Sequence, residues 1–189
     1  MSLAAPDDKP SGPRKARGDK PDAGAPARSA ARLAAVQALY QMETAGQGVE
    51  ATIREFRDHR LGGEVDGEIL HKADAAFFGD ILRGAVEAQG RLDGYLERSL
   101  AAGWRLARID ATARAILRAG LYELIRRPDV PARVVIDEYM NIANAFFSGD
   151  EPAFVNGVLD RAARAAREDE MPAAASSDPA ASGKADADG

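Results

Sequence analysis

Apolar residues recur at helical spacing along most of the chain. Between residues 132 and 147 they fall at Val135, Tyr139, Ile142 and Phe146, steps of four, three and four that place them on one face of an α-helix. Similar patterns predict seven helices, near residues 29–45, 48–60, 74–90, 92–100, 110–127, 132–147 and 150–167. No segment alternates between apolar and polar positions as a half-buried strand does, and no internal repeat is present. The chain is therefore expected to be all-α.

The start of the last helix is marked by its residues. Ser148 and Gly149 interrupt the preceding pattern, and Asp150 follows at the position of an N-cap. Glu151 comes next, in the first turn, where acidic residues are favoured. Gly157 lies inside this helix although glycine is a poor helix former. We expect another backbone to approach it closely, since glycine alone permits that.

Two pairs of arginines stand four residues apart on predicted helices. Arg28 and Arg32 share a face at the start of the first helix, where positive charge opposes the helix dipole. Arg114 and Arg118 share a face of the fifth helix. Both pairs are candidates for contact with phosphate, and Tyr40 is a candidate platform for a stacked base. From the residues alone, surface ion pairs and a core tyrosine explain these positions at least as well.

The two ends of the chain differ in composition from its middle. Residues 1–32 carry a net charge of +3, and residues 168–189 carry −5. Few large apolar residues occur in residues 1–27 or after Arg167, so neither end can bury enough surface to offset the entropy of ordering. We expect a disordered basic arm at 1–27, a folded domain at 28–167 and a disordered acidic tail at 168–189 that folding does not need.

The composition excludes several kinds of chemistry. The 189 residues include no cysteine, which rules out disulfides, thiolate metal sites and a cysteine nucleophile. The two histidines, His59 and His71, match no metal-binding motif, and no catalytic group of residues or phosphate-binding glycine loop is present. No apolar run is long enough to cross a membrane, and no signal peptide is seen. We expect a cytoplasmic protein without enzymatic activity, cofactor or metal.

Four sequence blocks resemble the NusB family of transcription antitermination factors. They are ARLAAVQALYQME at 31–43, AILRAGLYEL at 115–124, DVPARVVIDE at 129–138 and FVNGVLDRAA at 154–163. They occur in the order typical of the family and span most of the chain outside its two ends. The resemblance implies a domain of two small helical bundles.

The resemblance also implies RNA binding. Members of the family bind the boxA element of ribosomal RNA leader transcripts through an arginine-rich N-terminal segment, which Arg28 and Arg32 match, and through nearby helix surfaces. Ser29 and Ala30 stand where the family often has further arginines. By this resemblance we expect Arg28, Arg32, Tyr40, Arg114 and Arg118 to form the RNA-binding surface.

A protein partner is implied in the same way. The family forms a heterodimer with NusE, a protein of the small ribosomal subunit, and some members self-associate as homodimers. Asp150 and Phe154 match residues of the NusE interface, and Glu151 and Phe147 lie close to them in sequence. The simpler alternatives are an ordinary N-cap at Asp150 and a core phenylalanine at Phe154.

Together these features predict an adaptor that binds boxA-type RNA jointly with NusE. In that role it would join the antitermination complex of RNA polymerase and help the polymerase read through terminators in ribosomal RNA operons. The alternative function is a helical protein-interaction module that does not itself bind RNA.

Overall fold

The computed structural model describes residues 25–62, 64–65, 68–69, 72–100 and 105–171. Within these residues the chain forms seven α-helices, a 3₁₀ turn η1 and a short β-ladder. The helices are α1 Ala25–Ala45, α2 Val49–His59, α3 Ala75–Glu87, α4 Gln89–Ser99, α5 Ala111–Arg126, α6 Ala132–Phe146 and α7 Glu151–Ala166, with η1 at Leu106–Arg108. The predicted all-α class with seven helices is confirmed.

The ladder was not predicted. Strands β1 Glu64–Val65 and β2 Glu68–Ile69 pair antiparallel in the segment between α2 and α3. Each strand has two residues, too few for an alternating pattern to show in the sequence.

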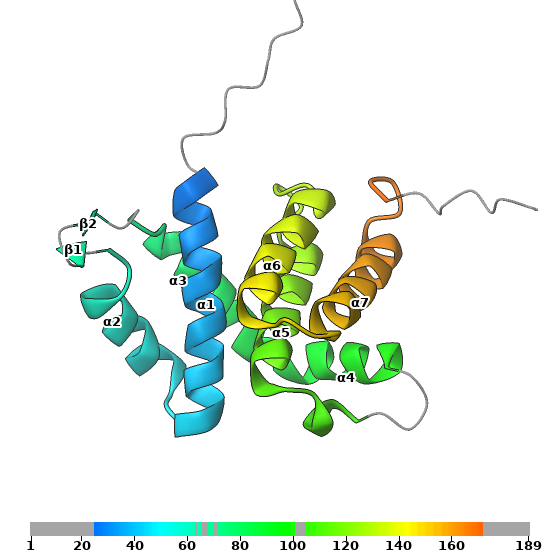
Figure 1. Ribbon diagram of the computed structural model, residues 1–189, viewed down its shortest axis with the longest axis horizontal. Coiled ribbons are helices and arrows are strands. Elements are labelled where there is room, and N and C mark those ends of the chain that lie inside the picture. The colour runs from blue at the N-terminus through cyan, green and yellow to red at the C-terminus, as the bar shows by residue number, and fades with distance from the viewer. Residues whose placement is uncertain (1–24, 63, 66–67, 70–71, 101–104, 172–189) are drawn as a thin grey trace, which may run out of the picture.

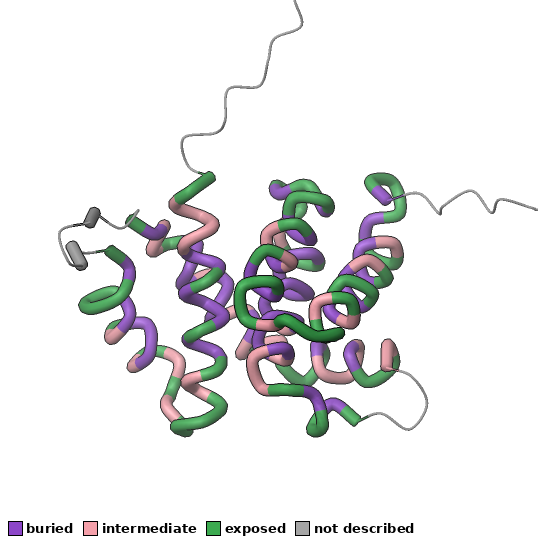
Figure 2. Tube along the Cα trace, viewed as in Figure 1, coloured by how far each residue is buried: buried purple, intermediate pink, exposed green. Residues whose placement is uncertain are grey.

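The helices form two groups that share α5 (Figure 1). In the first group α1 packs against α2 and α3, and in the second α5, α6 and α7 pack against one another with α4 across one end. Helix α5 also contacts α1 and α3, so it joins the two bundles. Buried residues accordingly run along the inner faces of the helices and along most of α5 (Figure 2).

Glycine sets the spacing at the centre of the second bundle. A Cβ added to Gly120 of α5 would lie 2.9 Å from Cδ2 of Leu159 on α7 and 3.2 Å from Cδ2 of Tyr139 on α6. Both neighbours are fully buried. The three helices therefore cross at a point where only glycine fits without displacing a core side chain.

The inner face of α1 differs from the one the spacing predicts. Helical spacing places Leu33, Val36 and Tyr40 on one side of α1, but Leu33 and Tyr40 are exposed and only Val36 of the three is buried. The buried face consists mainly of alanines, Ala31, Ala34, Ala35 and Ala38. Small side chains let α1 lie close to α3 and α5, and the two large apolar residues remain on the outer side.

Two of the three aspartates at helix starts act as side-chain caps. The carboxylate of Asp110 accepts hydrogen bonds from the backbone N–H groups of Thr112 and Ala113, at 2.7 and 3.2 Å, and Asp74 caps α3 in the same way. Asp150 does occupy the N-cap position of α7. However, its backbone is helical and its side chain makes no capping hydrogen bond. The predicted cap at Asp150 is therefore wrong in its chemistry, although right in its place.

The folded part of the chain continues past Arg167. The guanidinium of Arg167 is buried and donates to carbonyl oxygens at the end of α5. Glu170 accepts a 2.7 Å hydrogen bond from the backbone N–H of Ala132, the first residue of α6, and Met171 is buried. The packed part of the chain thus extends beyond the expected domain end, through Glu170 at the start of α6 and the buried Met171.

We expect a chain that ends at Arg167 to be less stable than one that ends at Met171. The shorter form loses the burial of Met171 and the hydrogen bonds of Glu170, together worth about 2–3 kcal/mol. Denaturant melts of both forms and of the full chain measure the difference. Equal stability of the two truncated forms would show that these contacts are not needed, whereas a form ending at Met171 that is much weaker than the full chain would assign a folding role to later residues.

Candidate functional site

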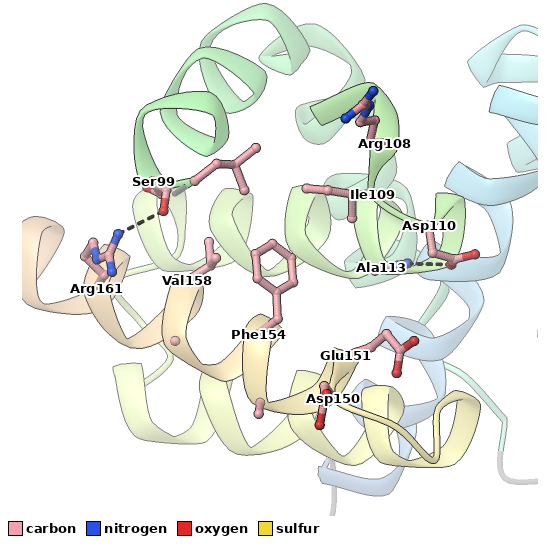
Figure 3. Close-up of a pocket in the computed structure, with 13 residues that line it drawn as sticks. Ser99, Arg108, Ile109, Asp110, Ala113, Asp150, Glu151, Phe154, Val158 and Arg161 are labelled. Carbon is pink, nitrogen blue, oxygen red and sulfur yellow. Dashed lines mark hydrogen bonds between the residues drawn. The ribbon is translucent and has the colours of Figure 1, made fainter. Parts of the chain in front are cut away.

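A groove of about 710 Å³ lies between the start of α7, the end of α4 and the segment that enters α5. Its apolar part is formed by Leu100, Ile109, Ala113, Ala153, Phe154, Gly157 and Val158, and its polar part by Ser99, Arg108, Asp110, Asp150, Glu151 and Arg161. The ring of Phe154 points from α7 into the space towards Ile109 (Figure 3).

Three of the four residues predicted for partner binding line this groove. Asp150 and Glu151 are exposed at one end, and Phe154 is half-buried and packs against the core. The fourth residue, Phe147, is half-buried against the core and does not line the groove. Its neighbour in sequence turns outward instead, because the last turn of α6 places Phe146 on the surface.

Gly157 faces the groove and not another part of the chain. A Cβ added to Gly157 would have no atom within 4 Å. The expectation of a close backbone neighbour is therefore not met by any described residue of this chain. The remaining wall of the groove comes from α4 and η1, about 50 residues earlier in sequence, which sequence spacing along α7 could not reveal.

A second hollow, of about 520 Å³, surrounds Tyr40. Tyr40 is 43% exposed and Phe146 is 47% exposed. The hollow is lined by Val36, Gln37, Tyr40, Gln41, Thr44, Arg60, Thr112 and Phe146. Two exposed aromatic rings, a guanidinium and several amide and hydroxyl groups thus border one space, which is a suitable arrangement for stacking and hydrogen bonding an unpaired base.

Neither Phe146 nor Arg60 was predicted from the sequence as a functional residue. Phe146 was assigned to the buried face of α6 because its spacing from Ile142 fits that face. Its position in the last turn of α6 is the one signal in the sequence that favours exposure. Arg60 follows α2 directly and has no motif around it, and only the packing of α2 beside α1 brings it towards Tyr40.

Arg32 does not lie on the surface. Its side chain is 3% exposed, and its Nη2 is 2.6 Å from Oε1 of Glu123, whose side chain is fully buried. The hydroxyl of Tyr139 donates to the same carboxylate at 3.1 Å, and Arg32 also pairs with Glu138 at 3.5 Å. Burial is the largest single influence on the pKa of Arg32 and lowers it. The hydrogen bond and charge of Glu123, together with Tyr139 and Glu138, outweigh burial, so the pKa of Arg32 is raised. The prediction of Arg32 as an RNA contact is corrected, because it is an internal ion-pair residue.

Arg114 and Arg118 are also engaged within the chain. Both pair with Glu43 of α1, and Arg118 binds Asp93 of α4 as well, with 2.8 Å between Nε and Oδ1. Their side chains are only 13% and 12% exposed. The hydrogen bond from Arg114 is the main cause of a lowered pKa at Glu43. These arginines brace α1 and α4 against α5 and do not present free cations to a phosphate.

Arg28 is the candidate arginine of α1 that stays accessible. It is half-buried, and its guanidinium carbon lies 5.2 Å from the ring centroid of Phe77. Arg127, whose guanidinium carbon lies 4.9 Å from the same centroid, binds Asp129 at 2.8 Å. That bond is the main reason why the pKa of Asp129 falls to about 2. Asp129 is therefore ionised near Arg28 at neutral pH and partly balances its charge.

The two hollows are neighbours. Thr112 of α5 lines the hollow at Tyr40, while Asp110 and Ala113, next to it in sequence, line the groove at Phe154. Likewise Phe146 borders the hollow at Tyr40, and Asp150, four residues on, borders the groove at Phe154. The start of α5 and the turn after α6 therefore separate the two sites, and ligands in both could touch each other.

The described residues offer neither a metal site nor a membrane span. No group of three or more His, Cys, Asp or Glu side chains among them is placed to hold a metal ion. None of the helices formed by these residues has the length and apolar character needed to cross a membrane. His59 is exposed at the end of α2, and His71 lies outside the described residues.

Comparisons of this sequence with known proteins all match one family. The model of the NusB family matches residues 29–164. The transcription antitermination protein NusB of Caulobacter vibrioides is 57% identical over 141 residues, which cover 75% of this chain and 95% of that protein. The NusB of Maricaulis maris is 56% identical over 144 residues, covering 76% of this chain and 90% of the relative.

Solved structures with a similar fold also contain NusB proteins. NusB of T. maritima, 30% identical, superposes with a TM-score of 0.62 and covers 76% of this chain and 96% of its own. A crystal structure of the antitermination factors NusB and NusE with dsRNA contains a chain that is 22% identical and has a TM-score of 0.58, with coverage of 73% and 96%. At that identity the second match supports the fold alone. From the match over residues 29–164, the two relatives above 50% identity and the shared helical fold, we conclude that this chain belongs to the NusB family.

Proposed function

We propose that the protein is an antitermination adaptor that binds boxA-type RNA of ribosomal RNA leader transcripts together with NusE. Its family consists of transcription antitermination proteins and not of enzymes. By joining the RNA polymerase complex on the nascent transcript, the adaptor would help the polymerase read through terminators. Because it would act on nascent transcripts, we place the protein in the cytoplasm.

The observation that carries the proposal is the pair of adjacent hollows. The hollow at Tyr40 offers two exposed aromatic rings and Arg60, features suited to single-stranded RNA. The groove at Phe154 is largely apolar with acidic residues at one end, features suited to a protein and unfavourable to phosphate. RNA in the hollow at Tyr40 and a protein in the neighbouring groove at Phe154 would be consistent with joint binding of RNA and NusE.

We predict that Tyr40→Ala combined with Phe146→Ala weakens binding of boxA RNA by tenfold or more without lowering stability. Stacking of a base on an aromatic side chain contributes about 1–3 kcal/mol, and both rings are on the surface. Fluorescence anisotropy with labelled boxA RNA, with NusE present, measures the affinity. Tyr40→Phe combined with Phe146→Tyr is the control, since it keeps both rings, and its affinity should stay near that of the wild type.

The contribution of ionic contacts to RNA binding is tested at Arg28. If Arg28 contacts one phosphate, Arg28→Ala lowers the slope of log K against log salt concentration by about 0.7 for a single strand. Arg98, an exposed arginine of α4, which does not pack on α1, is the control, and Arg98→Ala should leave the slope unchanged. An equal effect of the two variants would mean that only overall charge matters.

We predict that Phe154→Ala costs about 2 kcal/mol or more in NusE binding, roughly 30-fold in affinity. The ring projects into the groove but is half-buried, so we also expect a loss of stability of about 1–2 kcal/mol, below the 3–5 kcal/mol of a fully buried phenylalanine. A denaturant melt and a titration with NusE measure the two effects. The proposal is wrong for this groove if the variant is strongly destabilised yet binds NusE normally once folded.

The alternative, a protein-interaction module without RNA binding, is favoured by one observation. Three of the five residues first expected to bind RNA, Arg32, Arg114 and Arg118, are held in internal ion pairs. RNA binding that is absent at low salt, while NusE binding persists, would establish that alternative.

A further inference from the structure

Gly157 weakens the helix that contains it, and no described residue explains why it is there. It lies in the interior of α7, Glu151–Ala166, where glycine is about 1 kcal/mol less favourable than alanine. Its backbone has no positive φ, which among the described glycines occurs at Gly46 and Gly62. A Cβ at Gly157 would meet no atom within 4 Å, in contrast to Gly120, where it would meet Leu159 at 2.9 Å.

The surroundings of Gly157 show what it leaves open. It lines the groove between Phe154, one turn before it, and Arg161, one turn after it. Ala153, four residues earlier on the same face, is also small and also lines the groove. Beside the projecting ring of Phe154, α7 therefore presents a strip where its backbone is covered by at most one methyl group.

The charged residues that α7 contributes stand at opposite ends of the groove. Asp150 and Glu151 lie at the end where α7 begins, and Arg161 lies at the opposite end, where it donates a 2.9 Å hydrogen bond to the carbonyl of Ser99 (Figure 3). The facing wall adds Asp110 and Arg108, on the side away from Arg161. Between the two ends the lining is mainly apolar, with Ile109 and Val158 facing the ring of Phe154. A polypeptide with an apolar side chain between charged ones complements this pattern, whereas the acidic end repels an RNA backbone.

We propose that Gly157 is a contact point where the backbone of a NusE segment lies directly on α7. The segment places an apolar side chain beside Phe154 and a basic side chain towards Asp150 and Glu151. Glycine is then required by the partner and not by the fold, which accounts for its cost to the helix. This inference rests on the proposed function, because it takes NusE as the occupant of the groove.

The test compares Gly157→Ala and Gly157→Leu with wild-type protein. We expect Gly157→Ala to melt at the same temperature or higher, because it improves the helix. We expect its affinity for purified NusE to fall about tenfold, and that of Gly157→Leu to fall at least 100-fold, because larger side chains hold the partner backbone further away. The matched control is Ala165→Leu, an exposed position of α7 outside the groove, which should bind NusE normally.

Including Phe154→Ala in the same titrations separates the two proposals. If Phe154→Ala weakens NusE binding and both Gly157 variants bind normally, the groove is the partner site but the close backbone contact is wrong. If none of the three variants affects NusE binding, the proposed function of the groove fails. A clear loss of stability in Gly157→Ala would overturn the inference by giving the glycine a structural role, and so would a loss of boxA RNA binding by Gly157→Leu in the absence of NusE.

Discussion

Arg32→Ala is expected to lower the free energy of unfolding by about 3–5 kcal/mol, the usual cost of breaking a buried ion pair by removing one partner. The variant leaves the carboxylate of Glu123 fully buried and without the cation that now lies 2.6 Å away. It also leaves Tyr139 as the remaining donor to that carboxylate among the contacts described above. For a chain of this size the loss corresponds to a fall in Tm of roughly 6–20 °C. Urea and thermal melts followed by circular dichroism measure it.

A triple variant provides the control. Arg32→Met, Glu123→Leu and Tyr139→Phe together replace the polar cluster by apolar groups of similar size, so no charge is left unpaired. This protein should be markedly more stable than Arg32→Ala. The opposite result would be a free energy of unfolding within about 0.5 kcal/mol of wild type together with weaker binding of boxA RNA. It would show that Arg32 contacts RNA and is not an internal ion-pair residue.

Arg32 shows where inference from a sequence reaches its limit. A cation in the first turns of a helix gains nothing from the helix dipole, and a ligand outside the chain is a reasonable explanation. The actual partner is 91 residues away on α5. One signal was available, since Glu123 lies between Tyr122 and Leu124 in a helix that is otherwise apolar over a wide arc, and a buried carboxylate needs a cation.

The same limit applies to the inner faces of the helices. Spacing alone identifies the helices, because the period of 3.6 residues is present in all seven. It does not show whether the alanines or the leucines of a helix are buried. In α1 the alanines are inside and Leu33 and Tyr40 are outside, since close approach of α1 to α3 and α5 favours small residues. Where large residues are needed to fill space, as at Val135, Tyr139 and Ile142 of α6, the expected face is the buried one.

The candidate site was predictable only along single helices. Residues near the start of α7 could be grouped because they are close in sequence, and Asp150, Glu151 and Phe154 do lie together. The opposite wall, from Ser99 to Ala113, belongs to α4, η1 and α5. Its position depends on how α4 crosses the end of the second bundle, which no local pattern in the sequence encodes.

Arg167→Ala is expected to destabilise the protein by about 3–5 kcal/mol, because the guanidinium holds several backbone carbonyls at once. It donates to the oxygens of Leu124 at 2.7 Å, Arg127 at 2.6 Å and Val130 at 2.5 Å, and to that of Glu123 at 3.2 Å. The last carbonyls of a helix have no partner within the helix. Arg167 thus completes the end of α5 and fixes the turn that leads into α6. A urea melt of the variant measures the loss.

Arg167→Lys tests whether charge or shape is responsible. Lysine keeps a cation near the C-terminus of α5, which contributes about 0.3–1 kcal/mol through the helix dipole. However, its single ammonium cannot reach four carbonyls that the planar guanidinium contacts in different directions. We therefore expect Arg167→Lys to recover less than half of the stability lost in Arg167→Ala. Full recovery would mean that the positive charge suffices, and that the hydrogen bonds to the turn between α5 and α6 contribute little.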